Sequence, residues 1–432
     1  MNFSHFLARR IAFSNSKSFT KVIIRIAIAA VAISVATMII TSATIEGFKK
    51  EIQTKVFGFW GHIHITDTNI NRTFEQVPIN KNAEYIEEIK DIGQLEYQAP
   101  VSYFGKEVIG KYKRKSTVGG VKHMHPFALA PGILTTKKEF GAIVLKGVDK
   151  DFDWEYLPGF IKEGEAPDLN GAVTDGVVIS AVTARKLNLE VGKRFIVSFI
   201  KDGDQKKRAF TIKGIYNTGL EEYDKRFAIV DLRKVQEILQ WESDQVSGFE
   251  VFLDDPVDLD VVSEYIYTDV LPPRLYAETI KTKFPSIFEW LKLQDINEVI
   301  ILILMVLVAI INMITILLVF ILERTRMIGL LKALGSTNWD IRKVFLYNAG
   351  YIIFFGLLFG NAIGLGLCFL QDQFQFLKLD EASYYLSYAP VLVKWWNWFI
   401  INAATFFFTI LFLVIPTHLI SKIDPVKSIK FD

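Results

Sequence analysis

The chain alternates between long apolar runs and one long polar segment. Residues 26–45, 299–322 and 349–370 contain no charged side chain, and a fourth apolar run lies at about residues 398–420. Each run is long enough to cross the ~30 Å hydrocarbon core of a bilayer as a helix that rises about 1.5 Å per residue. The pattern therefore predicts four transmembrane helices.

The segment between the first two runs, residues 47–296, is polar and mixes strand-like with helix-like stretches at short spacing. Such a mixture is typical of an α+β domain. Helices are predicted after Ser180 and Asp231, which are good N-cap residues, and at residues 81–90. Strands are predicted at residues 60–66, 142–148, 176–180, 194–200, 208–216, 226–230 and 248–253. Residues 104–130 show weak periodicity, and no element is predicted there.

The predicted organisation is an α-helical membrane protein with a large α+β domain inserted between transmembrane helices 1 and 2. Residues 1–46 hold the first helix, preceded by an amphipathic stretch of aromatic and basic residues that is typical of an interfacial helix. A cleaved signal peptide is the alternative, but the apolar run is longer than a signal sequence requires and no clear cleavage site follows. Residues 47–296 form the inserted domain, and residues 297–432 hold helices 2 to 4.

A charge-rich amphipathic segment, residues 323–346, joins the second apolar run to the third. Ile328, Leu331 and Leu334 recur every three residues among basic side chains, which predicts a helix. Gly335 is expected to end this helix. We call residues 323–346 the elbow.

A second helix of the elbow is predicted to start at Thr337, because Thr337 and Asp340 resemble a capping box. The elbow is then an ordered pair of helices with a compact tip at residues 333–335. A basic loop that merely follows the positive-inside bias is the alternative. The leucines of the first helix are too apolar for a solvated loop, so we interpret them as a docking face.

Basic residues near the apolar runs predict the orientation of the chain. Lys and Arg number four in the first 21 residues, five in the elbow and three in the tail from Ser421 onward. The loop of residues 371–395 holds only Lys378 and Lys394. The positive-inside rule therefore places both termini and the elbow in the cytoplasm and the inserted domain outside.

Composition and charge exclude some classes of partner. The 432-residue chain is 51% apolar and 22% charged, with a net charge of +2. No long basic stripe with interleaved aromatic residues is present, so no nucleic-acid partner is predicted. The single cysteine, Cys368, lies in an apolar run, and an intramolecular disulfide is therefore excluded.

Polar and small residues within the apolar runs are candidates for helix packing. Asn312 needs a partner in hydrocarbon, so we expect it to face other helices. Gly356, Gly360 and Gly364 recur every four residues and form a ridge that lets helices approach closely. The ridge fits either packing within the subunit or a dimer seam, and the sequence leaves both open.

The sequence predicts neither a catalytic site nor a metal site. It contains no G-x-x-x-x-G-K-[ST] motif, so ATP hydrolysis would belong to another subunit. His62 and His64, like His123 and His125, alternate on likely strands, but neither pair has the additional ligands that a metal site needs. We interpret them as surface histidines, and the acidic cluster at residues 221–224 as a solvated turn.

Several stretches resemble the FtsX-like permease family, also called MacB-type or type VII ABC permeases. The sequence after the first run is IEGFKKEI, that at the elbow is NMITILLVFILERTRMIGLLKALGST, and that at the end is IPTHLISKIDPVKSIKFD. Two further stretches, GIYNTGLEEYDKRFAIVDL and VSGFEVFLDDPVDL, resemble the lipoprotein-releasing LolC/LolE branch. The resemblance covers nearly the whole chain, although Asn348 stands where such proteins often have Gln.

The resemblance implies a permease subunit of the bacterial inner membrane that transmits force, is not an enzyme and has no cofactor of its own. The implied partners are a cytoplasmic ABC ATPase that binds ATP and Mg²⁺, a second permease subunit of the same or a related sequence, membrane lipid, a lipoprotein and a periplasmic lipoprotein carrier. The elbow would dock in a groove of the ATPase through Met327, Ile328, Gly329, Leu330, Leu331, Lys332, Ala333, Leu334, Gly335 and Ser336.

Three functions are compatible with this resemblance. The favoured one is release of lipoproteins from the inner membrane for transport to the outer membrane. An FtsX-like regulator of cell-wall hydrolases is one alternative, and a MacB-like permease for efflux or peptide export is another.

The predicted topology can be tested with two markers. A reporter fused after Lys430 is expected in the cytoplasm, and a tag inserted near Asp202 is expected outside, because the basic residues flank the opposite ends of the spans. Accessibility of each marker to a membrane-impermeant reagent in spheroplasts measures its side. Two markers on the same side would contradict the four-helix topology.

Overall fold

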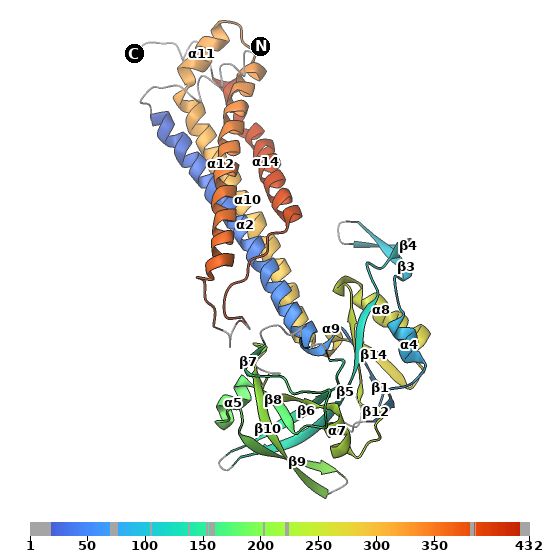
Figure 1. Cartoon of the computed structure of the whole chain (residues 1–432). Helices are drawn as coiled ribbons and strands as arrows, with labels where there is room; N and C mark the ends of the chain where they lie inside the picture. Colours follow the sequence, from blue (N-terminus) through green and yellow to red (C-terminus); the bar gives the residue numbers. More distant parts are fainter. Residues whose placement is uncertain are drawn as a thin grey trace. The chain divides into compact units, whose positions relative to one another are not determined.

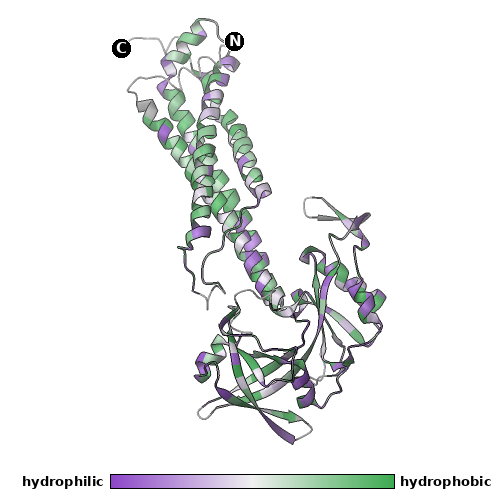
Figure 2. Cartoon of the chain, viewed as in Figure 1, coloured by the Kyte–Doolittle hydropathy of each residue, from purple (hydrophilic) through white to green (hydrophobic). Residues whose placement is uncertain are grey.

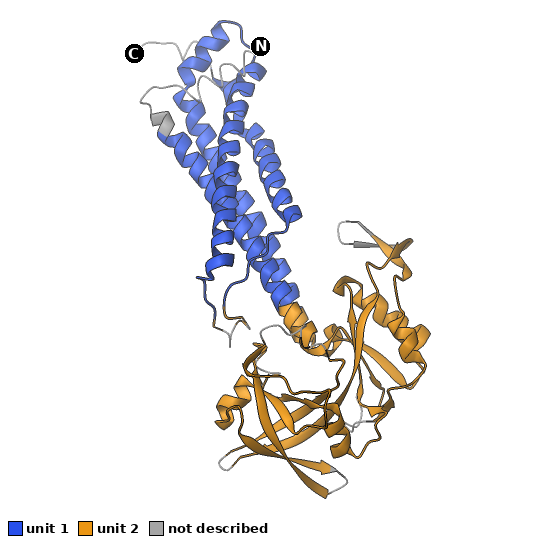
Figure 3. Cartoon of the chain, viewed as in Figure 1, with its two compact units in different colours: residues 1–51, 289–379, 388–432 blue, residues 52–288, 380–387 orange. Residues whose placement is uncertain are grey.

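The computed structural model divides the chain into two compact units (Figure 3). Unit 1 comprises residues 1–51, 289–379 and 388–432, and unit 2 comprises residues 52–288 and 380–387. The predicted amphipathic stretch near the N-terminus, Asp202, Glu221, Glu222 and the tail around Lys430 lie outside the described residues. The structure describes residues 19–69, 77–103, 106–136, 139–152, 154, 160–201, 204–220, 224–380, 384 and 386–423.

Unit 1 is built on four helices that are long and apolar enough to cross a membrane, as predicted (Figures 1 and 2). They are α2 (Phe19–Trp60), α10 (Pro285–Glu323), α12 (Asn338–Phe374) and α14 (Trp395–Thr417). The described part of the unit also contains two short helices, α11 (Thr325–Ala333) and α15 (Leu419–Lys422).

Helices α2 and α10 both extend beyond their apolar runs. Without a break, α2 continues through residue 60 and α10 starts at residue 285, so each helix belongs partly to unit 1 and partly to unit 2. The strand predicted at residues 60–66 therefore begins late, as β1 (Ile63–Asp67), because the preceding residues remain helical. Gly61, with φ of 70°, ends α2 in a conformation that favours glycine.

The glycine ridge of α12 lies against α2. A Cβ atom at Gly356 would lie 2.7 Å from Cβ of Val31, and one at Gly360 would lie 2.8 Å from Cβ of Val35. Gly364 meets the same helix farther along. Glycine thus allows the two backbones to approach more closely than any larger residue would, and the ridge serves packing within the subunit.

Polar side chains join α12 to α14. Asn361 Nδ2 donates to Asn402 Oδ1 at 2.7 Å, and Trp398 Nε1 donates to Asn361 Oδ1 at 2.5 Å. These bonds satisfy polar groups that would otherwise be exposed to hydrocarbon. Asn312 of α10 is half-buried, and its side chain forms no hydrogen bond within the described part of the chain.

Unit 2 is an α+β domain around one ten-stranded mixed sheet. Pairings between strands close a ring in the order β5, β6, β11, β8, β10 and β9, in which β9 pairs back with β5. Beyond the ring, β13, β1 and β14 extend the sheet from the first half of β5. The 15-residue strand β5 therefore belongs to both parts (Figure 1).

The strands and helices of unit 2 have the following bounds. The strands are β1 (Ile63–Asp67), β2 (Ile79–Asn80), β3 (Glu96–Tyr103), β4 (Lys106–Ser116), β5 (Val121–Thr135), β6 (Phe140–Val148), β7 (Ile161–Gly164), β8 (Gly176–Ser180), β9 (Arg194–Lys201), β10 (Asp204–Tyr216), β11 (Phe227–Asp231), β12 (Gln245–Val246), β13 (Gly248–Leu253) and β14 (Leu275–Thr279). The helices are α4 (Tyr85–Lys90), α5 (Ala181–Leu187), α7 (Leu232–Leu239), η2 (Pro256–Asp258), α8 (Leu259–Tyr265), η3 (Ile266–Val270) and α9 (Ile280–Lys283).

Local signals predicted the two capped helices correctly. Ser180 accepts a hydrogen bond from the backbone of Thr183, and Asp231 accepts one from the backbone of Arg233, as N-caps do. The helix predicted at residues 81–90 is shorter than expected, since only α4 forms there. No element was predicted for residues 104–130, but those that the structure describes, from residue 106 onward, include β4 and most of β5.

The close approach of α12 to α2 generates a testable prediction. Gly360→Val places new atoms against Val35 and the carbonyl of Ala32, so it should destabilise the bundle by about 1–3 kcal/mol. Gly366→Val is the matched control, because a Cβ there meets nothing within 4 Å. Thermal unfolding of the purified chain in detergent measures both. Equal midpoints for the two variants would contradict the packing role.

Candidate functional site

The elbow folds as two helices joined at Gly335. Helix α11 ends in a Schellman motif, in which Gly335 donates to the carbonyl of Lys332 and Ser336 donates to the carbonyl of Leu331, each at 3.0 Å. Gly335 has φ of 87°, a conformation that glycine adopts without strain. The prediction that Gly335 ends the first helix is confirmed.

The second helix of the elbow, the start of α12, has Thr337 as its N-cap. The Thr337 hydroxyl accepts a hydrogen bond from the backbone N–H of Asp340 at 3.2 Å. The same hydroxyl donates to the Asp340 carboxylate at 2.6 Å. The predicted cap is therefore present, although the carboxylate contacts the hydroxyl and not the backbone N–H that a full capping box would use.

The two faces of α11 have different environments. Ile328, Gly329 and Leu331 are buried in unit 1, so these three of the ten predicted coupling residues hold the elbow in place and do not form a docking surface. Leu330 is 55% exposed and Leu334 is 75% exposed. We call Leu330, Ala333, Leu334 and Gly335, which are exposed at the end of α11, the exposed tip. In the second helix of the elbow, Trp339 is 52% exposed and adds apolar surface.

Lys332 has a role that the sequence did not indicate. Its ammonium group donates to the carbonyl of Ile420 at 2.7 Å and to that of Ile423 at 2.8 Å. These carbonyls lie at the C-terminal end of α15, where a helix carries partial negative charge. Arg342 reaches the same segment and donates to His418 Nδ1 at 3.1 Å. The elbow is thus tied to the C-terminal segment as well as to α10 and α12.

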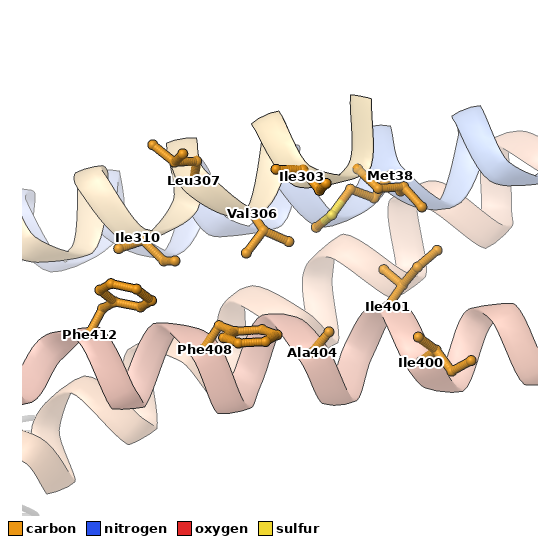
Figure 4. Close-up of a pocket in the computed structure, with 11 residues that line it drawn as sticks. Met38, Ile303, Val306, Leu307, Ile310, Ile400, Ile401, Ala404, Phe408 and Phe412 are labelled. Carbon is orange, nitrogen blue, oxygen red and sulfur yellow. The ribbon is translucent and has the colours of Figure 1, made fainter. Parts of the chain in front are cut away.

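Unit 1 also contains an apolar groove between α2, α10 and α14, with a volume of about 580 Å³. Figure 4 shows Phe408 and Phe412 of α14 on one side and Val306 and Ile310 of α10 on the other. The lining residues are Met38, Leu302, Ile303, Val306, Leu307, Ile310, Ile400, Ile401, Ala404, Phe408 and Phe412. Because all of these side chains are apolar, the groove suits hydrocarbon and not polar groups.

Unit 2 contains a row of buried ionisable side chains. His64 of β1, Glu250 of β13 and His125 of β5 are neighbours across the three strands, and each is at most 1% exposed. His125 Nε2 donates to Glu250 Oε2 at 2.9 Å. The ammonium nitrogen of Lys146, on β6, is fully buried and lies 2.7 Å from Glu250 Oε1.

This row contacts the end of α2. Lys146 Nζ donates to the carbonyl of Phe59 at 2.5 Å, and His64 Nε2 donates to the carbonyl of Trp60 at 2.5 Å. His64 Nδ1 accepts from Lys283 Nζ at 2.7 Å. We call the set of His64, His125, Lys146, Glu250 and Lys283 the buried ionic network.

The interpretation of the histidines as surface residues is wrong for three of the four. His62, His64 and His125 are buried, because β1 is covered on both faces and β5 is an inner strand of the sheet. Both ring nitrogens of His64 are engaged, and two ammonium groups lie in the network, so a cation would be repelled. Within the described residues, no group of three His, Cys, Asp or Glu side chains is arranged to hold a metal ion.

Burial and charge shift the pKa values in the buried ionic network and of the neighbouring His62. Burial lowers the pKa of His64 to about 3 and that of His62 to about 4, so both imidazoles are neutral near pH 7. Burial raises the pKa of Glu250, but the ammonium of Lys146 and the hydrogen bond from His125 outweigh it and lower that pKa to about 2. The network thus holds a charged carboxylate at its centre.

The acidic cluster at residues 221–224 is not a solvated turn at the position that the structure describes. Asp224 is 1% exposed and accepts hydrogen bonds from the backbone and the hydroxyl of Thr218, at 3.1 Å and 2.6 Å. Burial raises its pKa to about 6, against the effect of those hydrogen bonds. The acidic side chain fixes a turn of the domain, and the sequence carried no signal for its burial.

Comparison with known proteins covers both units. Residues 299–425 match the FtsX-like permease C-terminal family, and residues 26–267, more than half of the chain, match the MacB-like periplasmic core domain. The chain is 23% identical to the lipoprotein-releasing system transmembrane protein LolC of Buchnera aphidicola subsp. Acyrthosiphon pisum, over 94% of this chain and 93% of the relative.

Two further relatives differ in how much of their length is matched. The lipoprotein-releasing system transmembrane protein LolE of Haemophilus influenzae is 20% identical, over 92% of this chain and 91% of the relative. The probable syringafactin export ATP-binding/permease protein SyfD of Pseudomonas syringae pv. tomato is 29% identical, over 28% of this chain and 17% of the relative. With four apolar helices, an inserted α+β domain and both family matches, the chain belongs to the FtsX-like, MacB-type ABC permeases.

Proposed function

We propose that this chain is the permease subunit of an ATP-driven complex that releases lipoproteins from the inner membrane for transport to the outer membrane. The observation that carries the proposal is the similarity to LolC and LolE over more than nine-tenths of each chain. A match of that extent includes the inserted domain, the four helices and the elbow together. The shorter match to SyfD covers only part of this chain and 17% of that relative.

In this proposal ATP and Mg²⁺ bind to a separate cytoplasmic ABC ATPase, because the chain has no phosphate-binding motif of its own. The exposed tip of the elbow is the docking element, with Leu330 and Leu334 entering an apolar groove of the ATPase. The elbow continues directly into α10 and α12, so a movement of the ATPase displaces two transmembrane helices. A second permease subunit, of the same or a related sequence, completes the complex.

The apolar groove of unit 1 supports the proposal that the substrate carries lipid chains. Acyl chains of a lipoprotein, or of membrane lipid, are hydrocarbon, so they can pack against the apolar side chains of the groove without burying a polar group there. The inserted domain, on the periplasmic side in this proposal, would pass the released lipoprotein to a periplasmic carrier.

Export in the manner of a MacB-type permease is the second candidate, and the partial match to SyfD favours it. The two functions differ in what accumulates when the protein is removed. Depletion is expected to leave acylated proteins in the inner membrane fraction, because their extraction depends on the complex. Fractionation of acyl-labelled proteins by membrane density measures this.

Correct sorting of lipoproteins in the depleted cells would contradict the proposal. Chained cells would then favour regulation of a cell-wall hydrolase, and loss of an exported compound would favour export.

The exposed tip generates a further prediction. Ala333→Asp puts a carboxylate between Leu330 and Leu334, and an unpaired charge buried in an apolar groove costs several kcal/mol, about 3–5. The variant should reach the membrane in normal amounts, because the spans are unchanged, but should lose its ATPase on purification. Asn338→Asp is the control, since the same charge there lies exposed at the N-terminus of α12, where it is favourable. Retention of the ATPase by Ala333→Asp at the level of the control would show that the elbow is not the docking element.

A further inference from the structure

The buried ionic network lies where two helices enter unit 2. Helix α2 ends at Trp60, and α9, whose last residue is Lys283, directly precedes α10. His64 bonds to both, because its Nε2 donates to the carbonyl of Trp60 and its Nδ1 accepts from Lys283. One imidazole therefore connects the last turn of the incoming helix to Lys283, two residues before the outgoing helix begins.

Apolar packing joins the same two points. The ring of Trp60 lies 5.4 Å from that of Phe284 and 4.6 Å from that of Phe227 on β11. The ring of Phe57 lies 5.9 Å from that of Phe288, the last residue of α10 that belongs to unit 2. The end of α2 and the start of α10 are thus held to each other and to the sheet by rings as well as by charges.

Lys146 fixes the end of α2 from the other side. Its ammonium donates to the carbonyl of Phe59 and lies 4.8 Å and 4.9 Å from the ring centres of Phe59 and Trp60. A cation at these positions interacts favourably with the partial negative charge at the C-terminus of a helix and with aromatic faces. Glu250 balances the charge of Lys146 and is itself held by His125.

A contribution to the free energy of folding does not explain why charged residues, and not apolar ones, occupy these positions. Burying an ion pair costs desolvation energy that its attraction barely offsets, and apolar residues of similar volume often give equal stability. Ionic and hydrogen bonds differ from apolar packing because they are directional. Each bond here forms only when the carbonyl of Phe59 or Trp60 has one position relative to the sheet. A network of this kind resists rotation and sliding of a helix end, which apolar packing permits more readily.

We propose that the buried ionic network is a rigid joint that fixes the ends of α2 and α10 to the sheet of unit 2, so that movement of these helices moves the inserted domain as one body. His64, Lys146 and Lys283 are the positioning residues of this joint. The claim that the joint transmits force rests on the proposed function, whereas the claim that it is rigid does not.

Rigidity can be measured in the full chain in lipid nanodiscs. Cysteines replace Thr54, on the exposed side of α2 within unit 2, and Lys186, exposed on α5, in a Cys368→Ala background. Nitroxide labels at the two positions give a distance distribution by double electron–electron resonance. In the otherwise unchanged chain we expect a narrow distribution, and His64→Leu should broaden it roughly twofold, because both bonds of the imidazole are lost.

Two further variants serve as the control and as an alternative to His64→Leu. His123→Leu is the matched control, since His123 is on the same sheet and bonds through Nε2 to the carbonyl of Asp151, away from α2. It should leave the width unchanged. Lys283→Met removes only the bond from α9 and leaves Lys146 and Glu250 paired. With the helix label moved from Thr54 to Ser286, exposed at the start of α10, this variant decides the question if His64→Leu fails to fold. A folded Lys283→Met chain with a distribution as narrow as that of the control overturns the rigid joint.

Force transmission is tested separately, with the purified complex of permease and ATPase. Lys283→Met should retain most of the ATP hydrolysis and lose most of the lipoprotein release per ATP, whereas a merely structural defect would lower both through loss of the complex. A broadened distribution with unchanged release per ATP overturns transmission through the joint. Absence of release by the unmodified complex contradicts the proposed function instead, and the distance measurement still decides whether the joint is rigid.

Discussion

Within a bilayer every backbone N–H and C=O group must be paired inside the protein, and the form of unit 1 follows from this constraint. Four uninterrupted helices satisfy it, but water no longer drives them together, so close packing and polar contacts hold the bundle. The glycines of α12 let that helix lie against α2, and the hydrogen bonds around Asn361 join it to α14. The elbow packs against this bundle through its buried side chains.

The elbow combines an anchored face with an exposed one. Ile328 and Leu331 pack into the core of unit 1, while Lys332 binds the carbonyls at the end of α15. Anchoring of this kind keeps Leu330 and Leu334 at a defined position even though both are exposed. A rigid apolar tip binds a partner with less loss of conformational freedom than a mobile loop would, which suits the docking role that we propose for the tip.

Unit 2 differs from unit 1 because charged side chains are buried where two helices meet its sheet. Its ring of strands and its three-strand extension share β5, so the sheet is continuous across both parts. Glu250, at the centre of the buried row, interacts with side chains from β1, β5 and β6. The same strands that build the core of the domain therefore also bind the end of α2 that belongs to unit 2, through buried side chains.

The sequence by itself determined the elements whose cause is local. Apolar runs longer than the bilayer core specified the four helices, and Ser180, Asp231, Gly335 and Thr337 specified helix ends through bonds to residues at most four positions away. The order of these elements also determined the fold class, because a polar α+β segment lay between two spans. The glycine spacing on α12 likewise indicated close packing before its partner helix was known.

Only the tertiary structure decided which side chains meet across long separations. Lys146 and Glu250 are 104 positions apart in the sequence (250 − 146), and His64 is farther still from Glu250. No local pattern indicates that strand pairing and register bring these side chains together. Burial of His62 and Asp224 was missed for the same reason, since alternation along a strand shows that side chains share a face but not what covers it. Leu331 and Leu334 look alike in the sequence, yet one is buried and the other exposed, because the helix ends between them and the core of unit 1 covers only the first.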